Sequence, residues 1–345
     1  MPKDNPDSRS ISKEHVFDRA AFKECHAATI VEVEEGEFMV AFFAGTREGE
    51  EDVAIWATKS ERGLWSVPKR VAWDEGAPCW NPVLFKGGGG LLHLFYKVGF
   101  SPGTWTGVQL TSDDCGVSWS DPSYLPAGLL GPTKNKPITM SNGEVICGSS
   151  VESYRAWTCW AEVIGESDWR RFGPVCCEGV PKGVIQPSIV ELSEGHLRMF
   201  MRSAPSVARI CVAESHDYGR TWTKATPTDL PNPNSGIDAL RLPSGRILIV
   251  YNDSSTLRTP LSMAASNDGG RTWKKLLDLE TDAGEFSYPS VIQSSSGEST
   301  SYTPGNERGS GMPLSRTSGS LRFSLDDLGR LLRARIGVSL PRSVP

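Results

Sequence analysis

Side chains that could bind a sugar stand just before several apolar segments of this chain. They are Trp80 and Asn81 before PVLF, Lys136 before PIT, and Asn234 and Asp238 in PNPNSGID. An aromatic face stacks on a sugar ring, amide and carboxylate groups hydrogen-bond to hydroxyls, and a lysine attracts an anionic sugar. Core packing is the competing interpretation for Trp80, and a solvated surface charge is the competing one for Lys136. Their shared position at strand starts makes all five candidates for substrate binding.

Histidine is the side chain best suited to proton transfer near neutral pH. His26 begins the first apolar segment and is a candidate proton-transfer group, although a lone histidine beside an apolar strand is more often structural. His93, His196 and His216 lie in turn or outer-strand contexts and are interpreted as structural.

These candidates need a scaffold, and the sequence repeats one local pattern: an apolar strand, a glycine turn and a second apolar strand. Six copies span residues 28–45, 81–99, 136–150, 186–203, 238–253 and, incompletely, 287–298. A hairpin with flanking strands gives one four-stranded blade of a propeller. The sequence therefore predicts an all-β, six-bladed β-propeller with an incomplete last blade. A propeller brings equivalent points of its repeats together at its axis, where the candidate residues would meet.

A second repeat lies between the hairpins and has the spacing S-x-D-x-G-x-[S/T]-W. It occurs as SDDCGVSW (112–119), SHDYGRTW (215–222) and SNDGGRTW (266–273), with degenerate copies at Trp65 and Trp169. The tryptophans recur about every fifty residues, a period typical of propellers. Aspartate accepts N–H groups across a tight turn, glycine permits a left-handed conformation, and tryptophan packs between sheets. The box residues are therefore predicted to be structural.

Composition argues against several classes of protein. The net charge of −5, without a basic run, argues against nucleic-acid binding. No apolar stretch has the length of a membrane span, and the first residues do not resemble a secretory signal. The eight cysteines show neither a disulfide pattern nor a metal-binding spacing. We therefore expect a cytoplasmic monomer with reduced thiols, no metal, no cofactor and no membrane partner.

The boxes resemble the Asp-box, or BNR, repeats of the sialidase superfamily. Further segments extend this resemblance over roughly residues 20–298 and are similar to a BNR-repeat, sialidase-like family: CHAATIVE, GTREGEEDVAIW, WNPVL, KNKPI, GSSVES, IQPSIVEL, PNPNSGID, YND and EFSYPSVIQ. The resemblance implies a propeller with a carbohydrate site at its axis.

In sialidases, three arginines bind the substrate carboxylate, a tyrosine paired with a glutamate is the nucleophile, and an aspartate is the acid/base. By this resemblance, Arg202 and Arg258 match two of the arginines. Tyr288 in EFSYPS falls at the nucleophile, and Asp52 lies in the acid/base loop.

The chain departs from the sialidase pattern at two positions. The first strand, FKECHAATI, has no arginine and carries His26 instead, and Gln186 stands where the glutamate partner of the tyrosine is expected. Without that carboxylate, a tyrosine with a pKa near 10 is a weak nucleophile at neutral pH. The acid/base loop adds Glu48 as a catalytic candidate and Arg47 as a substrate-binding one.

Three functions are consistent with these residues. The first is a glycoside hydrolase that acts on terminal acidic sugars, sialic acid or a uronic acid. The second is a polysaccharide lyase on uronate-containing glycans, with Tyr288 or His26 as the base. The third is a carbohydrate-binding propeller without catalysis. An acidic glycan is the expected partner in each case.

Three regions are expected: an N-terminal extension (1–20) that completes the last sheet, the propeller (21–298) and an atypical tail (299–345). The tail is rich in Gly, Ser, Pro and Arg, which argues for disorder. Within it, LDDLGRLLRARI could form a short amphipathic helix. We hypothesise that a shifted reading frame after about residue 298 has replaced the last strand of the family.

Overall fold

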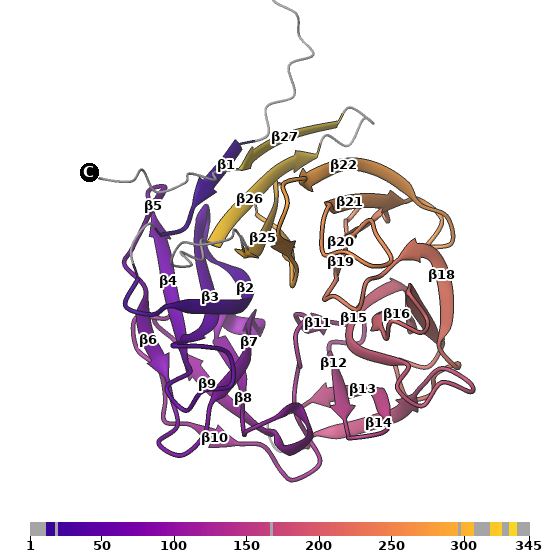
Figure 1. The fold of residues 1–345 in the computed structure, drawn as a ribbon, viewed down its shortest axis with the longest axis horizontal. Coiled ribbons are helices and arrows are strands. Elements are labelled where there is room, and N and C mark those ends of the chain that lie inside the picture. Colours follow the sequence, from indigo (N-terminus) through magenta and orange to yellow (C-terminus); the bar gives the residue numbers. More distant parts are fainter. Residues whose placement is uncertain are drawn as a thin grey trace, which may run out of the picture.

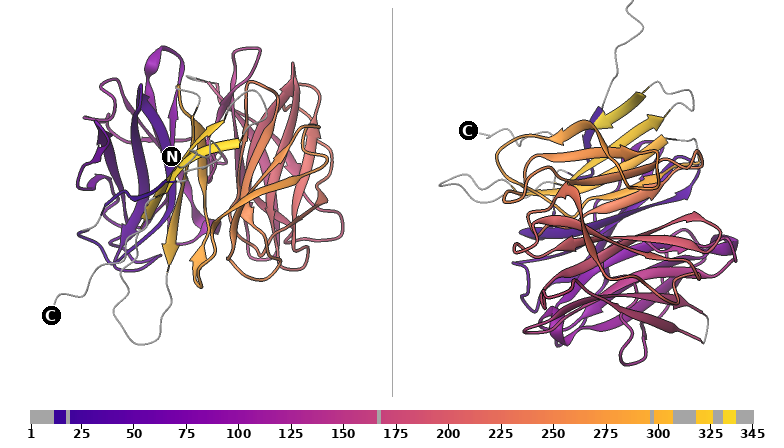
Figure 2. Two further views of the ribbon diagram at one scale, coloured as in Figure 1. Left: turned by 90° about the horizontal axis from the view of Figure 1, so that it is seen from above. Right: turned by 90° about the vertical axis from the view of Figure 1, so that its right-hand side faces the viewer.

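The computed structural model describes residues 12–17, 20–165, 168–295, 298–306, 318–325 and 331–336 (Figure 1). Strands dominate, and the helices among these residues are short 3₁₀ turns, Gly88–Gly90 and Pro102–Thr104. None of the described helices is long and apolar enough to cross a membrane. The sheets surround a central axis, and side views show loops gathered on two opposite faces (Figure 2). The fold is an all-β β-propeller, as predicted.

Five sheets are regular antiparallel blades, with the first strand near the axis and the last at the rim (Figure 1). The first blade contains β2 (Glu24–Glu34), β3 (Glu37–Gly45), β4 (Ala54–Glu61), β5 (Leu64–Trp65) and β6 (Lys69–Ala72). The second contains β7 (Cys79–Lys86), β8 (Leu92–Val98), β9 (Thr106–Ser112) and β10 (Ser123–Tyr124). The third contains β11 (Ile138–Thr139), β12 (Val145–Glu152), β13 (Trp157–Ile164) and β14 (Arg170–Val175). The fourth contains β15 (Val184–Ser193), β16 (His196–Ser203), β17 (Arg209–Ser215) and β18 (Thr226–Pro231). The fifth contains β19 (Asp238–Arg241), β20 (Ile247–Asn252), β21 (Leu261–Ser266) and β22 (Lys274–Glu280).

The remaining sheet is irregular. It contains β1 (Ser12–His15), β23 (Glu285–Phe286), β24 (Ser290–Gln293), β25 (Glu298–Asn306), β26 (Ser318–Leu325) and β27 (Leu331–Ile336). Strand β1 is antiparallel to β26 but parallel to β27, which departs from a four-stranded meander. The predicted count of six blades is therefore corrected to five regular blades, with this mixed sheet completing the ring. The physical cause is that the alternating apolar pattern stops near residue 298, so the chain's N-terminal segment supplies a strand, as expected.

The tail predicted to be disordered carries strands in the described residues. Strands β25, β26 and β27 lie between residues 298 and 336, and Leu331–Ile336 is a strand where the sequence indicated a helix. The rest of the tail, and most of the N-terminal extension, lie outside the described residues.

The blades pack on one another through apolar side chains. One buried cluster joins the first two blades and includes Ile55, Leu94 and Val108, all fully buried. Removing such side chains from water is the main stabilising contribution to a fold of this kind. All eight cysteines are free thiols.

The Asp boxes form the turns that the sequence predicts. Asp268 accepts hydrogen bonds from the hydroxyl of Thr272 at 2.6 Å and from its backbone N–H at 2.9 Å. These bonds hold the pKa of Asp268 below its usual value. Trp273 then packs edge-to-face on Phe200 of the neighbouring blade, with 5.6 Å between the ring centroids. The prediction that box residues are structural is confirmed, because they shape a turn and join two blades.

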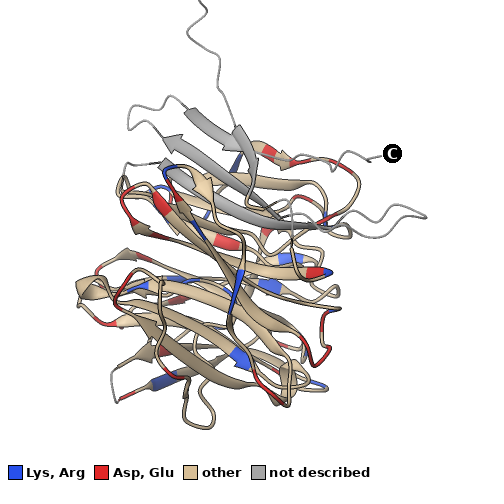
Figure 3. Cartoon of the chain, turned by 90° about the vertical axis from the view of Figure 1, so that its left-hand side faces the viewer, with Lys and Arg blue, Asp and Glu red and all other residues tan. Residues whose placement is uncertain are grey.

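Charges of both signs are interspersed on the side of the ring drawn in Figure 3. Some charged side chains pair with one another: Lys59 lies 3.7 Å from Glu34 and 3.5 Å from Glu37.

Candidate functional site

The inner strands share a distortion near the point where they enter their sheets. Register shifts interrupt β2, β7 and β15 close to their first residues. Left-handed φ angles of 50°, 41°, 51°, 59° and 58° recur there, at Ala27, Asn81, Gln186, Asn234 and Tyr288. Residues other than glycine rarely adopt this conformation, and bulges of this kind re-aim side chains beside active sites. The repeated distortion marks this end of the ring as the candidate site.

Arg202, near the end of β16, joins three parts of the chain at this end. Its side chain is buried, its Nε donates to Asn234 Oδ1 at 2.8 Å, and its Nη1 donates to Gln186 Oε1 at 3.0 Å. The same Nη1 donates to the hydroxyl of Tyr288 at 2.8 Å. Arg202 and Tyr288 are 86 positions apart in sequence. They meet because the ring of blades closes.

The ring of Tyr288 lies near two arginines. The guanidinium carbons of Arg202 and Arg258 are 5.6 Å and 6.0 Å from the centre of its ring. Because Arg202 donates to the phenol oxygen, the tyrosine's own proton is free for another acceptor. Gly236 leaves room for this ring, since a Cβ at that position would come within 3.2 Å of Tyr288.

Arg258 is held in place by a carboxylate that the sequence analysis missed. Its Nη1 donates to Glu285 Oε1, and its Nη2 donates to the backbone oxygen of Asn234 at 3.0 Å. Burial by itself raises the pKa of Glu285, but the charge and hydrogen bond of Arg258, the hydroxyl of Ser287 and the charge of His26 outweigh it. The pKa of Glu285 is therefore lower than usual, and the carboxylate stays ionised beside Arg258.

A second missed carboxyl group, Glu152, ends strand β12. Its Oε1 is buried and accepts no hydrogen bond from the described residues. Burial raises the pKa of Glu152, and the positive charge of Arg202 opposes the rise. A buried carboxyl group with a raised pKa holds a proton more readily than a solvated one, which makes Glu152 a candidate for proton transfer.

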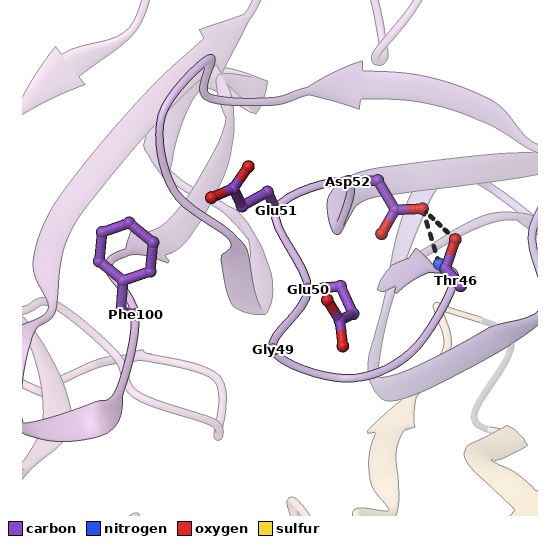
Figure 4. A pocket seen from close by; sticks show the side chains of 6 residues that line it. All are labelled: Thr46, Gly49, Glu50, Glu51, Asp52 and Phe100. Carbon is purple, nitrogen blue, oxygen red and sulfur yellow. Dashed lines mark hydrogen bonds between the residues drawn. The ribbon is translucent and has the colours of Figure 1, made fainter.

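The loop between β3 and β4 forms an open, acidic pocket (Figure 4). Its lining residues are Thr46, Gly49, Glu50, Glu51, Asp52 and Phe100. Asp52 accepts hydrogen bonds from the backbone N–H and the hydroxyl of Thr46, at 2.8 Å and 2.6 Å. Arg47 is largely exposed and pairs with Glu50. Asp52 is thus fixed in the loop, whereas Arg47 lies on the surface.

His26 connects this loop to the arginine cluster. Its Nε2 is 3.9 Å from Glu48 Oε2, and its ring packs near Phe43. Its positive charge also lowers the pKa of Glu285, the partner of Arg258. The predicted residues His26 and Glu48 therefore lie together, next to the cluster.

Lys136 and Asp238, two of the predicted binding residues, bind to each other and to neighbouring strands. Asp238 is 1% exposed and accepts hydrogen bonds from Lys136 Nζ at 2.8 Å, Ser188 Oγ at 3.0 Å and the backbone N–H of Val291 at 2.8 Å. These partners belong to the third, fourth and last sheets, so the carboxylate joins them to the fifth blade. The polar groups of Lys136 and Asp238 are directed at each other.

Trp80 and Asn81 are also held within the scaffold. Trp80 is buried, its Nε1 donates to the backbone oxygen of Gly99 at 2.6 Å, and its ring packs near Phe43. Asn81 is buried and its Nδ2 donates to the backbone oxygen of Thr133 at 3.0 Å. These contacts match the competing interpretation of Trp80 as a core residue.

Lys134 joins the inner strands beneath the site. Its buried Nζ donates to Asn135 Oδ1 at 2.9 Å, to the backbone oxygen of Ile237 at 3.2 Å and to that of Pro289. Burial lowers the pKa of Lys134 to about 7, although the charge of Asp238 opposes the change. The hydrogen bonds of Lys134 therefore link several blades next to the candidate site.

The structure thus brings Gln186, Arg202, Asn234, Arg258 and Tyr288 into one connected cluster. Two guanidinium groups beside a tyrosine can bind a planar anion such as a carboxylate. The missed residues had signals in the sequence: Glu285 begins the EFSYPS segment, and Glu152 ends an apolar strand within GSSVES.

Residues 36–300 match the family described as BNR repeat-like domain. Among curated proteins, no sequence matches the chain. Several solved structures share its fold. A protein of unknown function from Dyadobacter fermentans has a TM-score of 0.74 at 20% identity, over 91% of this chain and 98% of that one.

Several of the similar structures carry sialidase names. The intramolecular trans-sialidase from Ruminococcus gnavus has a TM-score of 0.70 at 13% identity, over 91% of this chain and 97% of that one. A Hadza microbial sialidase has a TM-score of 0.69 at 17% identity, over 87% of this chain and 65% of that one. At these low identities, the similarity is evidence for a shared fold alone.

Proposed function

Because the chain belongs to the BNR repeat-like domain family of sialidase-like proteins, we propose that it is a glycoside hydrolase acting on terminal acidic sugars of glycans. The proposed substrates are glycans that end in sialic acid or in a uronic acid. The observation that carries the proposal is the position of Tyr288 beside both Arg202 and Arg258, near the distorted starts of the inner strands.

In the proposed reaction, the sugar carboxylate binds to Arg202 and Arg258. Charge-assisted hydrogen bonds from two guanidinium groups give both affinity and orientation. The anomeric carbon then faces Tyr288, whose oxygen attacks it, while Asp52 protonates the departing glycosidic oxygen. Water afterwards hydrolyses the glycosyl–tyrosine bond: Asp52 takes the proton of the attacking water and is restored, and the tyrosine oxygen regains its proton from the group that had accepted it.

The proton of Tyr288 needs an acceptor in this scheme, and Gln186 cannot serve because its amide is neutral. We assign this role to Glu152, whose pKa is raised by burial and which interacts electrostatically with Arg202. The assignment is supported by Oε1 of Glu152, which is buried and has no hydrogen-bond partner among the described residues.

A uronate lyase is the second candidate function, and one observation favours it. Arg202 donates hydrogen bonds to the amide oxygen of Gln186 and to the oxygen of Tyr288. This arrangement suits a tyrosine that removes a proton from the carbon next to a uronate carboxylate. Arg258 would stabilise the negative charge that develops on that carboxylate.

The test is a product analysis with α-linked sialosides and uronate-terminated oligosaccharides. Mass spectrometry distinguishes a hydrolysed sugar from an unsaturated one. Tyr288→Phe should lower turnover by about 100-fold or more. The matched control Tyr218→Phe should not, because the Tyr218 hydroxyl donates to Glu194 in an exposed turn. Binding of acidic sugars without turnover would instead identify a non-catalytic propeller, and full activity in Tyr288→Phe would refute the role of that tyrosine.

A further inference from the structure

Two histidines and a glutamate meet in the fourth blade, at the end of the strands remote from Arg202. His196 is the first residue of β16, Glu214 lies in β17, and His216 follows the end of β17. The strands are antiparallel with Arg198 opposite Glu214, so His196 stands opposite His216. Alternate residues of a strand project from the same face of a sheet. All three side chains therefore project from one face.

Their ligand atoms converge. Nε2 of His196 is 3.2 Å from Glu214 Oε2, and Nε2 of His216 is 3.7 Å from the same oxygen. The two imidazole rings stack with 4.2 Å between centroids and an angle of 26°. One imidazole is enough for an ion pair with a glutamate, and two stacked imidazolium ions would repel each other. A cation shared by two neutral imidazoles accounts for both rings facing one oxygen.

The distances suit a tetrahedral metal ion. Zinc binds histidine nitrogen at about 2.0–2.1 Å and carboxylate oxygen at about 2.0–2.2 Å. Neighbouring ligand atoms of a tetrahedron with such bonds are about 3.4 Å apart. The separations of 3.2 Å and 3.7 Å lie on either side of this value, and all three ligand atoms lie within 4.8 Å of one another. Side-chain rotations can therefore bring the three atoms to this geometry.

Arg198 orients the carboxylate. It donates from Nη2 to Glu214 Oε1 and from Nη1 to the backbone oxygen of Gly269, and its side chain is 5% exposed. One carboxylate oxygen is thus occupied, and Oε2 is left facing the histidines. Hydrogen-bond partners of this kind fix the ligands of metal sites.

We propose that His196, Glu214 and His216 bind a divalent transition-metal ion, with zinc as the best match for two imidazoles and one carboxylate. The side chain of His216 is 68% exposed, so the ion can enter from solvent and water can complete its coordination. Six residues of β16, roughly 20 Å, separate this site from Arg202. The bound ion would link the turn between β15 and β16 to the Asp box at 215–222, and it would take no part in the chemistry at the axis.

The test uses the full chain after treatment with a chelator. Zinc affinity is measured by titration calorimetry, and cobalt(II) is added as a spectroscopic probe of coordination. Magnesium serves as the ion that imidazole ligands do not favour. The variants are His216→Ala and His196→Gln, with His93→Gln as the control that removes a histidine elsewhere.

We expect a single zinc ion per chain, a raised melting temperature in zinc, and a tetrahedral cobalt spectrum. Each ligand variant should bind zinc at least about 10-fold more weakly, and should melt like the unaltered chain when metal is absent. The His93→Gln control should bind as the unaltered chain does. Equal zinc affinity in His216→Ala and the unaltered chain would overturn the proposal, as would an absence of zinc binding to the chelator-treated chain.

Discussion

Replacing Asp238 by asparagine tests whether the inner strands are held together by a buried charge. The Asp238 carboxylate is 1% exposed, and the side chain of its partner Lys136 is 15% exposed, with 2.8 Å between Nζ and Oδ2. Asparagine keeps the shape and can still accept the hydrogen bond of Val291, so the substitution removes mainly the charge. Lys136 would then be left largely buried without its counter-ion.

The magnitude follows from this geometry. At an effective dielectric constant of about 20, two unit charges 2.8 Å apart attract by roughly 6 kcal/mol. Desolvation of both groups offsets part of this attraction, and removal of one partner from a buried pair costs about 3–5 kcal/mol. Because Lys136 is partly exposed, we take the lower end, about 3 kcal/mol. The melting temperature should then fall by about 4 °C.

The assay is thermal unfolding followed by circular dichroism, with Glu178→Gln as the control. Glu178 pairs with Lys224 at 2.6 Å, but both side chains are mostly exposed, so its loss should leave the melting temperature unchanged. The double variant Lys136→Met with Asp238→Asn should recover part of the loss, because no buried charge is left alone. An unchanged melting temperature in Asp238→Asn, with a loss of sugar binding instead, would refute the reasoning and restore Asp238 to the substrate site.

The pKa shifts of Glu152 and Glu285 have opposite signs, so the two residues should change stability with pH in opposite directions. Burial raises the pKa of Glu152, so the folded state binds more protons than the unfolded state above pH 4.5, and stability falls as pH rises through the raised pKa. Glu152→Gln should therefore be more stable than the unaltered chain by about 1 kcal/mol at pH 8 and equally stable at low pH. Urea unfolding at both pH values measures the difference. Equal stability of the variant and the unaltered chain at pH 8 would contradict this. The pKa of Glu285 is lowered, so its contribution is complete above pH 4.5 and is lost as pH falls through the lowered pKa. Glu285→Gln should flatten this acid limb of the stability curve, and an unaltered limb would show that the pair with Arg258 does not form.

Local chemistry explains why the scaffold could be predicted. The turn of an Asp box depends on residues within four positions, such as Asp268 and Thr272, and is therefore readable from sequence. The same holds for each hairpin. The mixed sheet could not be predicted in full, because β1 and β26 pair across more than three hundred residues and the tail lacks an alternating pattern.

The site was predictable only where a motif marks it. Arg202, Arg258 and Tyr288 meet as the resemblance implied. The pairing of Lys136 with Asp238 spans 102 residues, and nothing local indicates that two polar strand starts face each other rather than a ligand. Burial of a carboxyl group such as Glu152 depends likewise on neighbouring blades.

The most direct test of the account is the affinity of acidic monosaccharides for the arginine pair at Tyr288. Titration calorimetry would compare sialic acid and glucuronic acid with neutral galactose, in a Glu285→Gln background and in the same background with Arg258→Met. The background keeps a partly buried carboxylate from being left without its arginine when Arg258 is removed. A charge-assisted hydrogen bond contributes about 1.5–3 kcal/mol, so loss of Arg258 should weaken binding of an acidic sugar by about 10- to 100-fold and leave galactose unaffected. Equal binding of the acidic sugars with and without Arg258, or equal binding of galactose and the acidic sugars, would contradict the account.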